Sequence, residues 1–270
     1  MLLKLLKYDF KSMLRSFVPL WIAFIAVSII NRFTARIPDM GNLEGFSSLV
    51  TRTSLFLYAI LMIGINVVGL VLVIQRFYNG LLKDEGYLMF TLPVKPYQHV
   101  LSKGIASTAV ITLNALISVG SVIILAGPSA FMDWMRMIAE NISEINMNPN
   151  LLISLVMLLA FVSIIANVYR IYASMTLGHL FNNHRVAFSV GAYLAISVAM
   201  SMLGSISVTI FSHTSGLNWL INAVTAFFTA GESTNAFWAM YGTSIGVTLL
   251  QLAAFYITTE RILAKKLNLE

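Results

Sequence analysis

The stretch QRFYNGLLKDEGYLMFTLPVKPYQH, residues 75–99, is the longest polar and turn-rich interruption in an otherwise apolar chain. Its glycines, prolines and charged side chains exclude it from the hydrocarbon core of a bilayer, where every backbone polar group needs an internal partner. Part of the stretch is nevertheless too apolar for an ordinary solvated loop and contains Tyr87, Leu88, Met89, Phe90 and Leu92. The pattern predicts a short helix that begins at the acidic Asp84 and Glu85 and ends at Pro93. Such a helix would present an apolar face outside the membrane.

The composition of the whole chain indicates an integral membrane protein. Of its 270 residues, 58% are hydrophobic and only 10% are charged, whereas a soluble domain carries about 25% charged residues. The absence of cysteine excludes disulfides, thiolate metal sites and cysteine nucleophiles. The formal net charge of +6 does not indicate a nucleic-acid partner, because the basic residues flank apolar segments as membrane topology requires.

Six uncharged apolar segments predict an all-α integral membrane protein with six transmembrane helices in a single transmembrane domain, residues 1–270. The segments cover about residues 17–31, 54–74, 104–126, 151–168, 186–211 and 236–259. Residues 1–16 predict an additional amphipathic helix, because lysine and arginine recur there every three or four residues and leave the opposite face apolar. Such a helix lies in the headgroup plane. The alternative is a secretory signal, but charged residues interrupt its apolar region and no small-residue cleavage site follows.

The distribution of lysine and arginine predicts the orientation of the spans in the membrane. With a cytoplasmic N-terminus, thirteen of these residues lie on the inner side: Lys4, Lys7, Lys11, Arg15, Arg76, Lys83, Lys95, Lys103, Arg170, Arg185, Arg261, Lys265 and Lys266. Four lie on the outer side: Arg32, Arg36, Arg52 and Arg136. This bias predicts that both termini and the 75–99 connection are cytoplasmic.

Three connections then face outward. Residues 32–53 are polar and mixed, and residues 128–150 are acidic. Residues 212–235 contain no lysine or arginine and carry several large apolar side chains between glycines. Because this last stretch is too short and interrupted to span, we expect it to dip into the outer leaflet as a re-entrant hairpin.

Catalytic chemistry is not evident in the sequence. The dipeptide Gly-Lys does not occur, which excludes a phosphate-binding loop of the Gly-x-x-x-x-Gly-Lys type. No clustered acid, base or nucleophile indicates an enzyme. His179 and His184 are five residues apart, a spacing that does not place both side chains on one helical face, so we expect no metal pair there.

A few polar residues fall within spans that otherwise lack ionisable side chains: Asn66, Asn114, Asn167 and Gln251. Two interpretations remain open. The side chains can form hydrogen bonds between helices, or they can mark a polar point on a translocation path.

The segment RFYNGLLKDEGYLMFTLPVKPYQHVLSK closely resembles the cytoplasmic loop between spans two and three of permease subunits in the ABC-2 class of ATP-binding-cassette exporters. In that family an Asp-Glu-Gly-Tyr-Leu-x-x-Thr-Leu-Pro-Val-like run forms the coupling helix that docks on the ATPase. The matching residues here are Asp84, Glu85, Gly86, Tyr87, Leu88, Thr91, Leu92, Pro93 and Val94. Residues 173–186, ASMTLGHLFNNHRV, resemble the family's inner connection between spans four and five. Residues 1–16 resemble its elbow helix, and residues 212–235 resemble its outer re-entrant helices.

The resemblance implies a transport subunit rather than an enzyme, located in a bacterial plasma membrane and most similar to exporters of amphipathic peptides such as bacteriocins. It implies two copies of a separate ATPase that bind ATP and Mg, a second copy of this chain, and membrane lipid as partners; the chain itself would hold no cofactor. ATPase docking falls to Lys83, Asp84, Glu85, Gly86, Tyr87, Leu88, Phe90, Leu92 and Pro93. The second inner loop contributes Gly178, His179, Phe181, His184 and Arg185.

Residue spacing is compatible with this docking role. Tyr87 and Phe90 are three residues apart and can share a helical face, as can Leu88 and Leu92 at a spacing of four. Aromatic side chains of this kind fill pockets of partner proteins, although the same helix could instead lie on lipid. Two further functions remain as alternatives: an exporter of drugs or lipids, and a self-contained channel or immunity membrane protein.

Overall fold

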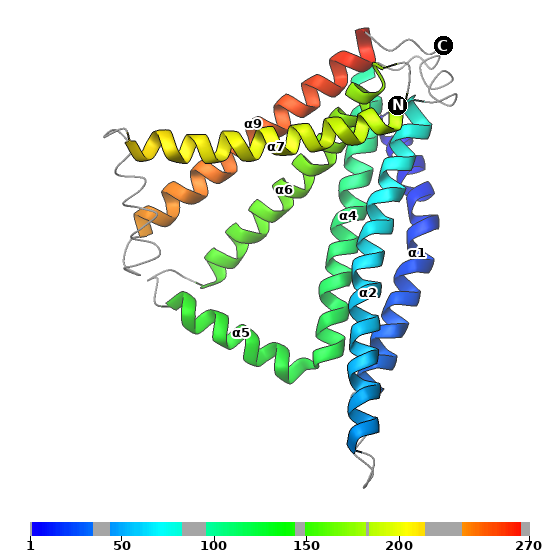
Figure 1. Ribbon diagram of the computed structural model, residues 1–270, viewed down its shortest axis with the longest axis vertical. Coiled ribbons are helices and arrows are strands. Elements are labelled where there is room, and N and C mark those ends of the chain that lie inside the picture. The colour runs from blue at the N-terminus through cyan, green and yellow to red at the C-terminus, as the bar shows by residue number, and fades with distance from the viewer. Residues whose placement is uncertain are drawn as a thin grey trace. The chain divides into compact units, whose positions relative to one another are not determined.

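The computed structural model describes residues 2–34, 44–82, 96–143, 149–181, 184–213 and 234–265. Throughout these ranges the regular structure is helical (Figure 1). The elements are α1 (Leu2–Thr34), α2 (Glu44–Phe77), the π-helical turn η1 (Tyr78–Leu82), α4 (Pro96–Ala126), α5 (Pro128–Ser143), α6 (Pro149–Gly178), α7 (Arg185–His213) and α9 (Thr234–Lys265).

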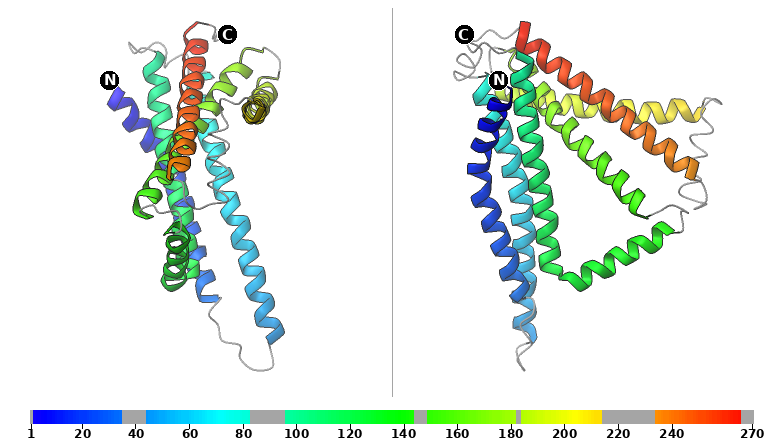
Figure 2. Two further views of the ribbon diagram at one scale, coloured as in Figure 1. Left: turned by 90° about the vertical axis from the view of Figure 1, so that its left-hand side faces the viewer. Right: turned by 180° about the vertical axis from the view of Figure 1, so that it is seen from behind.

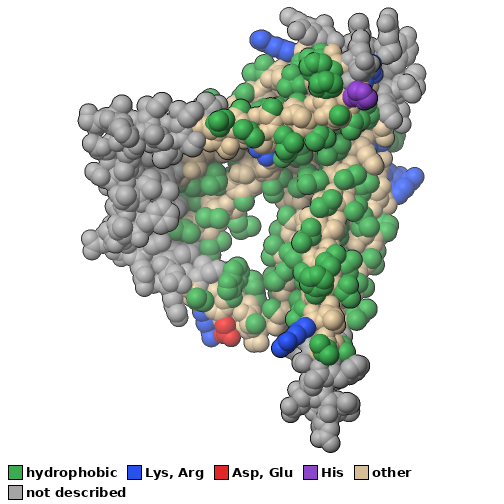
Figure 3. Space-filling model, viewed as in Figure 1, with side chains coloured by type: hydrophobic (Ala, Val, Ile, Leu, Met, Phe, Trp, Pro, Cys, Tyr) green, Lys and Arg blue, Asp and Glu red, His purple; other side chains and the backbone are tan. Residues whose placement is uncertain are grey.

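Six of these helices are long and apolar enough to cross a membrane, which confirms the predicted fold class at this level. The candidate spans are Leu3–Phe33, Arg52–Leu82, Tyr97–Ala126, Asn150–Gly178, Arg185–Met202 and Tyr241–Ala264. Hydrophobic side chains are spread over all of the described surface seen in Figure 3, where charged side chains are few. So much exposed apolar surface is not found on soluble monomeric proteins. Together with the six candidate spans, it indicates that the chain is a multi-pass membrane protein.

The chain divides into two compact units, of which the first contains residues 1–76 and 105–136. In this unit α1, α2 and α4 lie side by side (Figure 2). Their contact surface contains buried aromatic rings: Phe24 of α1 stacks on Tyr58 of α2 with ring centroids 5.7 Å apart. An ion pair joins Asp9 and Arg76 across 3.5 Å, from carboxylate oxygen to guanidinium nitrogen.

The second unit contains residues 77–104 and 137–270. Its central helix is α6, which packs against both α7 and α9. The contact with α9 includes Tyr169 and Tyr256, whose rings meet edge to face at 5.5 Å. Tyr169 also lies against Gly104 of α4, where a side chain larger than hydrogen would collide with the phenol.

The helices differ from the predicted elements mainly in length. A separate elbow helix over residues 1–16 is not confirmed, because α1 continues without a break from Leu2 to Thr34. Helix α2 begins at Glu44, so much of the predicted polar connection 32–53 is helical. The predicted outer connection 128–150 contains the amphipathic helix α5, which the sequence analysis missed. Of the expected re-entrant hairpin, residues 214–233 lie outside the described residues.

The interruption at residues 75–99 is shorter than the sequence suggested. Gly80 does not end the helix at this point, because α2 passes directly into η1 and the helical path continues to Leu82. The next described residue, Pro96, begins α4, where its fixed φ and missing N–H suit a first helical turn. The connection between the two helices is therefore confined to residues 83–95.

Candidate functional site

The predicted ATPase-docking residues Lys83, Asp84, Glu85, Gly86, Tyr87, Leu88, Phe90, Leu92 and Pro93 lie outside the part of the chain that the structure describes. Their expected coupling helix therefore stays a prediction. The structure does describe both ends of this connection and the second predicted loop. These segments belong to the second unit, and together they form the candidate site.

The first end of the connection is packed into the protein. Phe77 is fully buried and stacks on Tyr172 of α6, with ring centroids 3.9 Å apart and planes inclined by 16°. Leu81 and Leu82, the last residues of η1, are also buried. Tyr78 meets His179 edge to face at 6.3 Å. These two ring contacts and two buried leucines leave little freedom for the point at which residues 83–95 begin.

Past the second end of the connection, Tyr97 is still exposed, and burial begins at His99. His99, Val100 and Lys103 of α4 have at most 3% of their surface exposed. The Tyr172 hydroxyl donates a hydrogen bond of 3.2 Å to the Lys103 carbonyl, so that one side chain of α6 contacts both ends. A Cβ at Gly80 would lie 2.6 Å from the Lys103 ammonium nitrogen. This close approach places a positive charge near the C-terminal end of α2 and η1, where the helix dipole favours it.

The second predicted loop joins α6 to α7 beside these residues. The α6 helix ends at Gly178, where any side chain would collide with Ser189 of α7. His184 has a positive φ of 55° directly before α7 begins at Arg185. The guanidinium of Arg185 lies 3.5 Å from Nε2 of His179. His179 and His184 thus lie on a turn. The spacing argument from the sequence had treated them as two positions of one helix.

The environment of His179 favours the neutral imidazole. Burial lowers the pKa of this side chain below its ordinary value of 6.5, and the charge of Arg185 lowers it further. With Nε2 accepting from Arg185, the proton lies on Nδ1, which is buried and has no hydrogen-bond partner within the described ranges. A protonated ring would place a second cation beside Arg185.

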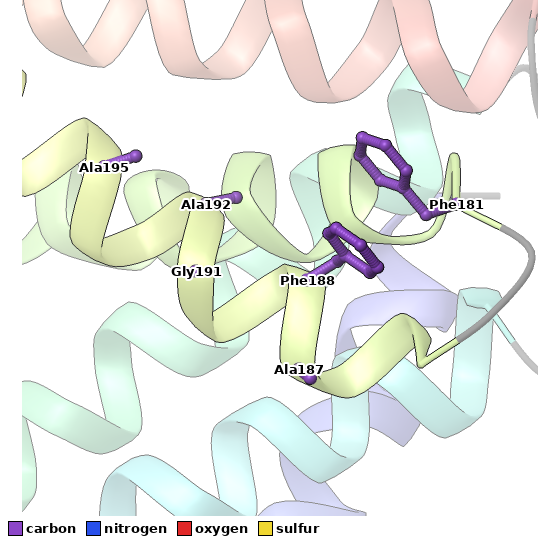
Figure 4. A pocket seen from close by; sticks show the side chains of 6 residues that line it. All are labelled: Phe181, Ala187, Phe188, Gly191, Ala192 and Ala195. Atoms are coloured by element: carbon purple, nitrogen blue, oxygen red, sulfur yellow. The ribbon is translucent and has the colours of Figure 1, made fainter.

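An open apolar groove of about 400 Å³ follows the start of α7 (Figure 4). At one end Phe181 and Phe188 stack with ring centroids 4.3 Å apart. Beyond them the wall consists of small side chains: Ala187, Gly191, Ala192 and Ala195. The groove contains no charged group and therefore suits an apolar occupant.

Two of the four predicted intramembrane polar residues meet in the first unit. Asn114 donates to Asn66 at 3.1 Å and accepts from the indole N–H of Trp21 at 2.9 Å. Asn66 in turn donates to Ser118 at 3.4 Å and to the Met62 carbonyl at 2.7 Å. The amide groups are thus engaged with α1, α2 and α4, which favours the helix-packing interpretation for this pair.

The other two predicted polar residues lie elsewhere, in the second unit. Gln251 is half-buried on α9. Asn167 is exposed on α6 and accepts a hydrogen bond from Arg170. Arg170 was expected just beyond the fourth span, but α6 extends to Gly178 and places it within the candidate span. The sequence prediction ended the span at this charge, whereas the helix continues past it for about two further turns.

Within the described residues no group of three or more histidine, cysteine, aspartate or glutamate side chains could hold a metal ion. The chain matches no protein-family model, no curated protein and no solved structure. The site is consequently defined by its own geometry: buried residues on both sides of a short connection, held against the α6–α7 turn.

Proposed function

We propose that the chain is the membrane-spanning permease subunit of an ATP-driven exporter of the ABC-2 class, coupled to a separate ATPase through residues 83–95. The observation that carries this proposal is the run Asp84 to Val94, which resembles a coupling helix. Buried residues on both sides of this run give further support. Leu82 and His99 are each only 2% exposed.

Firm anchoring is what a coupling element requires. If the loop could move freely, a displacement by the ATPase would change only the conformation of the loop. If its ends are packed, the same displacement moves the helices to which the loop is attached. The Tyr172 side chain contacts Phe77 on one side of the connection and Lys103 on the other. A displacement of residues 83–95 would therefore reach α6 as well as α2 and α4.

The exporter works as a homodimer with two ATPase subunits, because six spans are few for a path that encloses a peptide. The apolar groove on α7 supports this assembly, since Ala187, Gly191 and Ala195 are spaced by four residues and small side chains at that spacing let membrane helices approach closely. The cargo is an amphipathic peptide, for which the 14 methionines of the chain supply adaptable apolar surface.

The test is capture of the ATPase by the permease. A Walker-type ATPase encoded beside this gene would be the candidate, and the two proteins would be co-expressed and purified through a tag on the permease. Replacing Tyr87 and Phe90 by alanine should lower the affinity of the permease for the ATPase about thirtyfold and reduce ATPase recovery accordingly. The reason is that truncated interface aromatics commonly cost about 2 kcal/mol or more of binding free energy. Leu88→Ala with Leu92→Ala tests the other face of the same helix.

A double variant that captures the ATPase as well as the wild type would refute the docking role. A mass that fits one permease and one ATPase would refute the dimer. ATP hydrolysis that does not respond to amphipathic peptides would refute the peptide cargo and favour drugs or lipids instead. Failure to capture any ATPase would favour a self-contained channel or immunity protein.

A further inference from the structure

Arg170 is a charged side chain within a candidate membrane span, and its partners among the described residues are neutral. One terminal nitrogen, Nη2, donates to the Asn167 amide oxygen and to the Tyr193 hydroxyl, the latter at 3.2 Å. The guanidinium carbon lies 5.1 Å from the centroid of the Tyr193 ring. These contacts fix the guanidinium plane in the contact between α6 and α7, but they do not neutralise its charge.

The two remaining nitrogens of Arg170 differ in access. Nε is enclosed by protein and has no acceptor. Nη1 takes no part in a hydrogen bond with another described residue and is not enclosed. It is therefore the donor that an acceptor from outside the protein can reach. Leaving a guanidinium without an anionic partner in a membrane is costly, and such residues commonly mark a functional site.

The position of Arg170 along α6 gives its depth in a bilayer. Helix α6 has 30 residues and is about 45 Å long, which matches the bilayer together with its headgroup layers. Arg170 precedes the end of the helix at Gly178 by eight residues, or about 12 Å. With α6 centred and parallel to the membrane normal, and with each headgroup layer about 7 Å thick, the Arg170 backbone would lie about 5 Å below the hydrocarbon boundary, a distance that an arginine side chain can bridge.

We propose that Arg170 binds the phosphate of a phospholipid headgroup at the contact between α6 and α7, with Asn167 and Tyr193 holding the guanidinium in position. Phosphate offers anionic oxygens, which accept a charge-assisted hydrogen bond from the open Nη1. The lipid provides that phosphate at the depth where Nη1 is open. This inference requires a membrane-spanning α6 but does not depend on the proposed exporter function.

Lipid titration of the purified full-length chain, followed by native mass spectrometry, tests the site. The ligands are phosphatidylglycerol, diacylglycerol with the same acyl chains but no phosphate, and inorganic phosphate. Arg170→Gln is compared with Arg261→Gln, which removes the same charge from an exposed position near the end of α9. Arg170→Lys keeps the charge but loses the planar guanidinium that Asn167 and Tyr193 hold in position.

We expect the wild type and Arg261→Gln to bind phosphatidylglycerol alike, and Arg170→Gln to bind it about tenfold more weakly, the loss typical of a charge-assisted hydrogen bond. Diacylglycerol should bind more weakly than phosphatidylglycerol to the wild type and should not respond to Arg170→Gln. Inorganic phosphate should show no Arg170-dependent binding at the same concentration.

Equal affinity of Arg170→Gln and wild type for phosphatidylglycerol would overturn the site. Arg170-dependent binding of inorganic phosphate at lipid-like affinity would identify free phosphate as the ligand and overturn the lipid assignment. If Arg170→Gln does not fold, Arg170→Lys decides the matter, because wild-type affinity in that variant would exclude a guanidinium-specific clamp.

Discussion

At the scale of single residues, the α6–α7 turn is defined by one unusual pair. Arg185 and His179 approach each other as cation and neutral acceptor, and His179 is buried with 7% of its surface exposed. The pair is stable only while the imidazole is uncharged, because a second proton would set two cations side by side. His179 is thus a titratable group at the base of the proposed coupling segment.

The first prediction is that acid weakens this turn. The pKa of His179 is lowered in the folded protein, so below about pH 6.5 the unfolded chain binds a proton that the folded chain accepts less readily. The contribution to stability is fully present above that pH and is lost as the pH falls through the lower folded-state pKa. The thermal midpoint in detergent should therefore decrease between pH 7.5 and pH 5.5 less steeply in His179→Gln than in the wild type.

The matched control is His184→Gln, which removes an exposed histidine from the same turn. It should keep the wild-type pH dependence. Identical slopes for wild type and His179→Gln would show that His179 does not contribute to the acid sensitivity.

At the scale of the helices, a polar chain joins α1, α2 and α4 where the predicted spans are most apolar. It continues from Asn66 and Ser118 through Ser121, whose hydroxyl lies 2.6 Å from that of Tyr58. Close packing accompanies these bonds, since a Cβ at Gly69 would lie 3.3 Å from the Phe17 ring. Polar groups inside a bilayer need hydrogen-bond partners within the protein. Here α1, α2 and α4 supply those partners to one another.

The second prediction concerns the residue at the centre of this chain. Asn114→Leu leaves the Trp21 indole N–H and the Asn66 amide oxygen without their partner. Interhelical hydrogen bonds in membrane proteins contribute about 0.6 kcal/mol each and at most about 1.7, so the variant should lose about 1–2 kcal/mol of stability. Denaturation in mixed micelles measures this loss.

Gln251→Leu provides the comparison, because it makes a similar exchange at a half-buried site on α9 that has no part in this polar chain. Its stability should remain within about 0.5 kcal/mol of the wild type, as for a site without a critical contact. Equal losses in the two variants would indicate a general effect of apolar substitution rather than of the Asn114 bonds.

At the scale of the whole molecule, function depends on which side of the membrane carries residues 83–95. Six spans place the two termini on the same side, and thirteen of the seventeen lysines and arginines fall on that side under the predicted orientation. An ATPase can reach the proposed coupling segment only if this side is cytoplasmic.

The third prediction is that the termini and the connection 83–95 are cytoplasmic. The chain contains no cysteine, so a single introduced cysteine reports its own location without background. A membrane-impermeant maleimide should label Lys95→Cys only after the cells are opened, whereas Arg136→Cys, on the exposed surface of α5, should react in intact cells. Labelling of Lys95→Cys from outside intact cells would invert the topology and exclude the coupling role.

The sequence by itself determined the six apolar spans, the all-α class and the absence of thiol chemistry. Those properties depend on the transfer of each segment from water to lipid, which sums over neighbouring residues and needs no knowledge of the fold. Helix ends were predicted less well. Apolarity indicates where a segment enters lipid, whereas the helices of α1, α2 and α6 continue past that boundary because backbone hydrogen bonding persists there.

Tertiary structure alone decided which side chains meet. The sequence identified Asn66 and Asn114 but could not join them to each other or to Trp21, which is 93 residues from Asn114. It also could not pair Phe77 with Tyr172, or Arg170 with Tyr193. The physical reason is that an apolar helix face has almost the same free energy in contact with lipid as in contact with another apolar face. The partners of a helix are therefore selected by close packing and by the few polar groups that need hydrogen bonds.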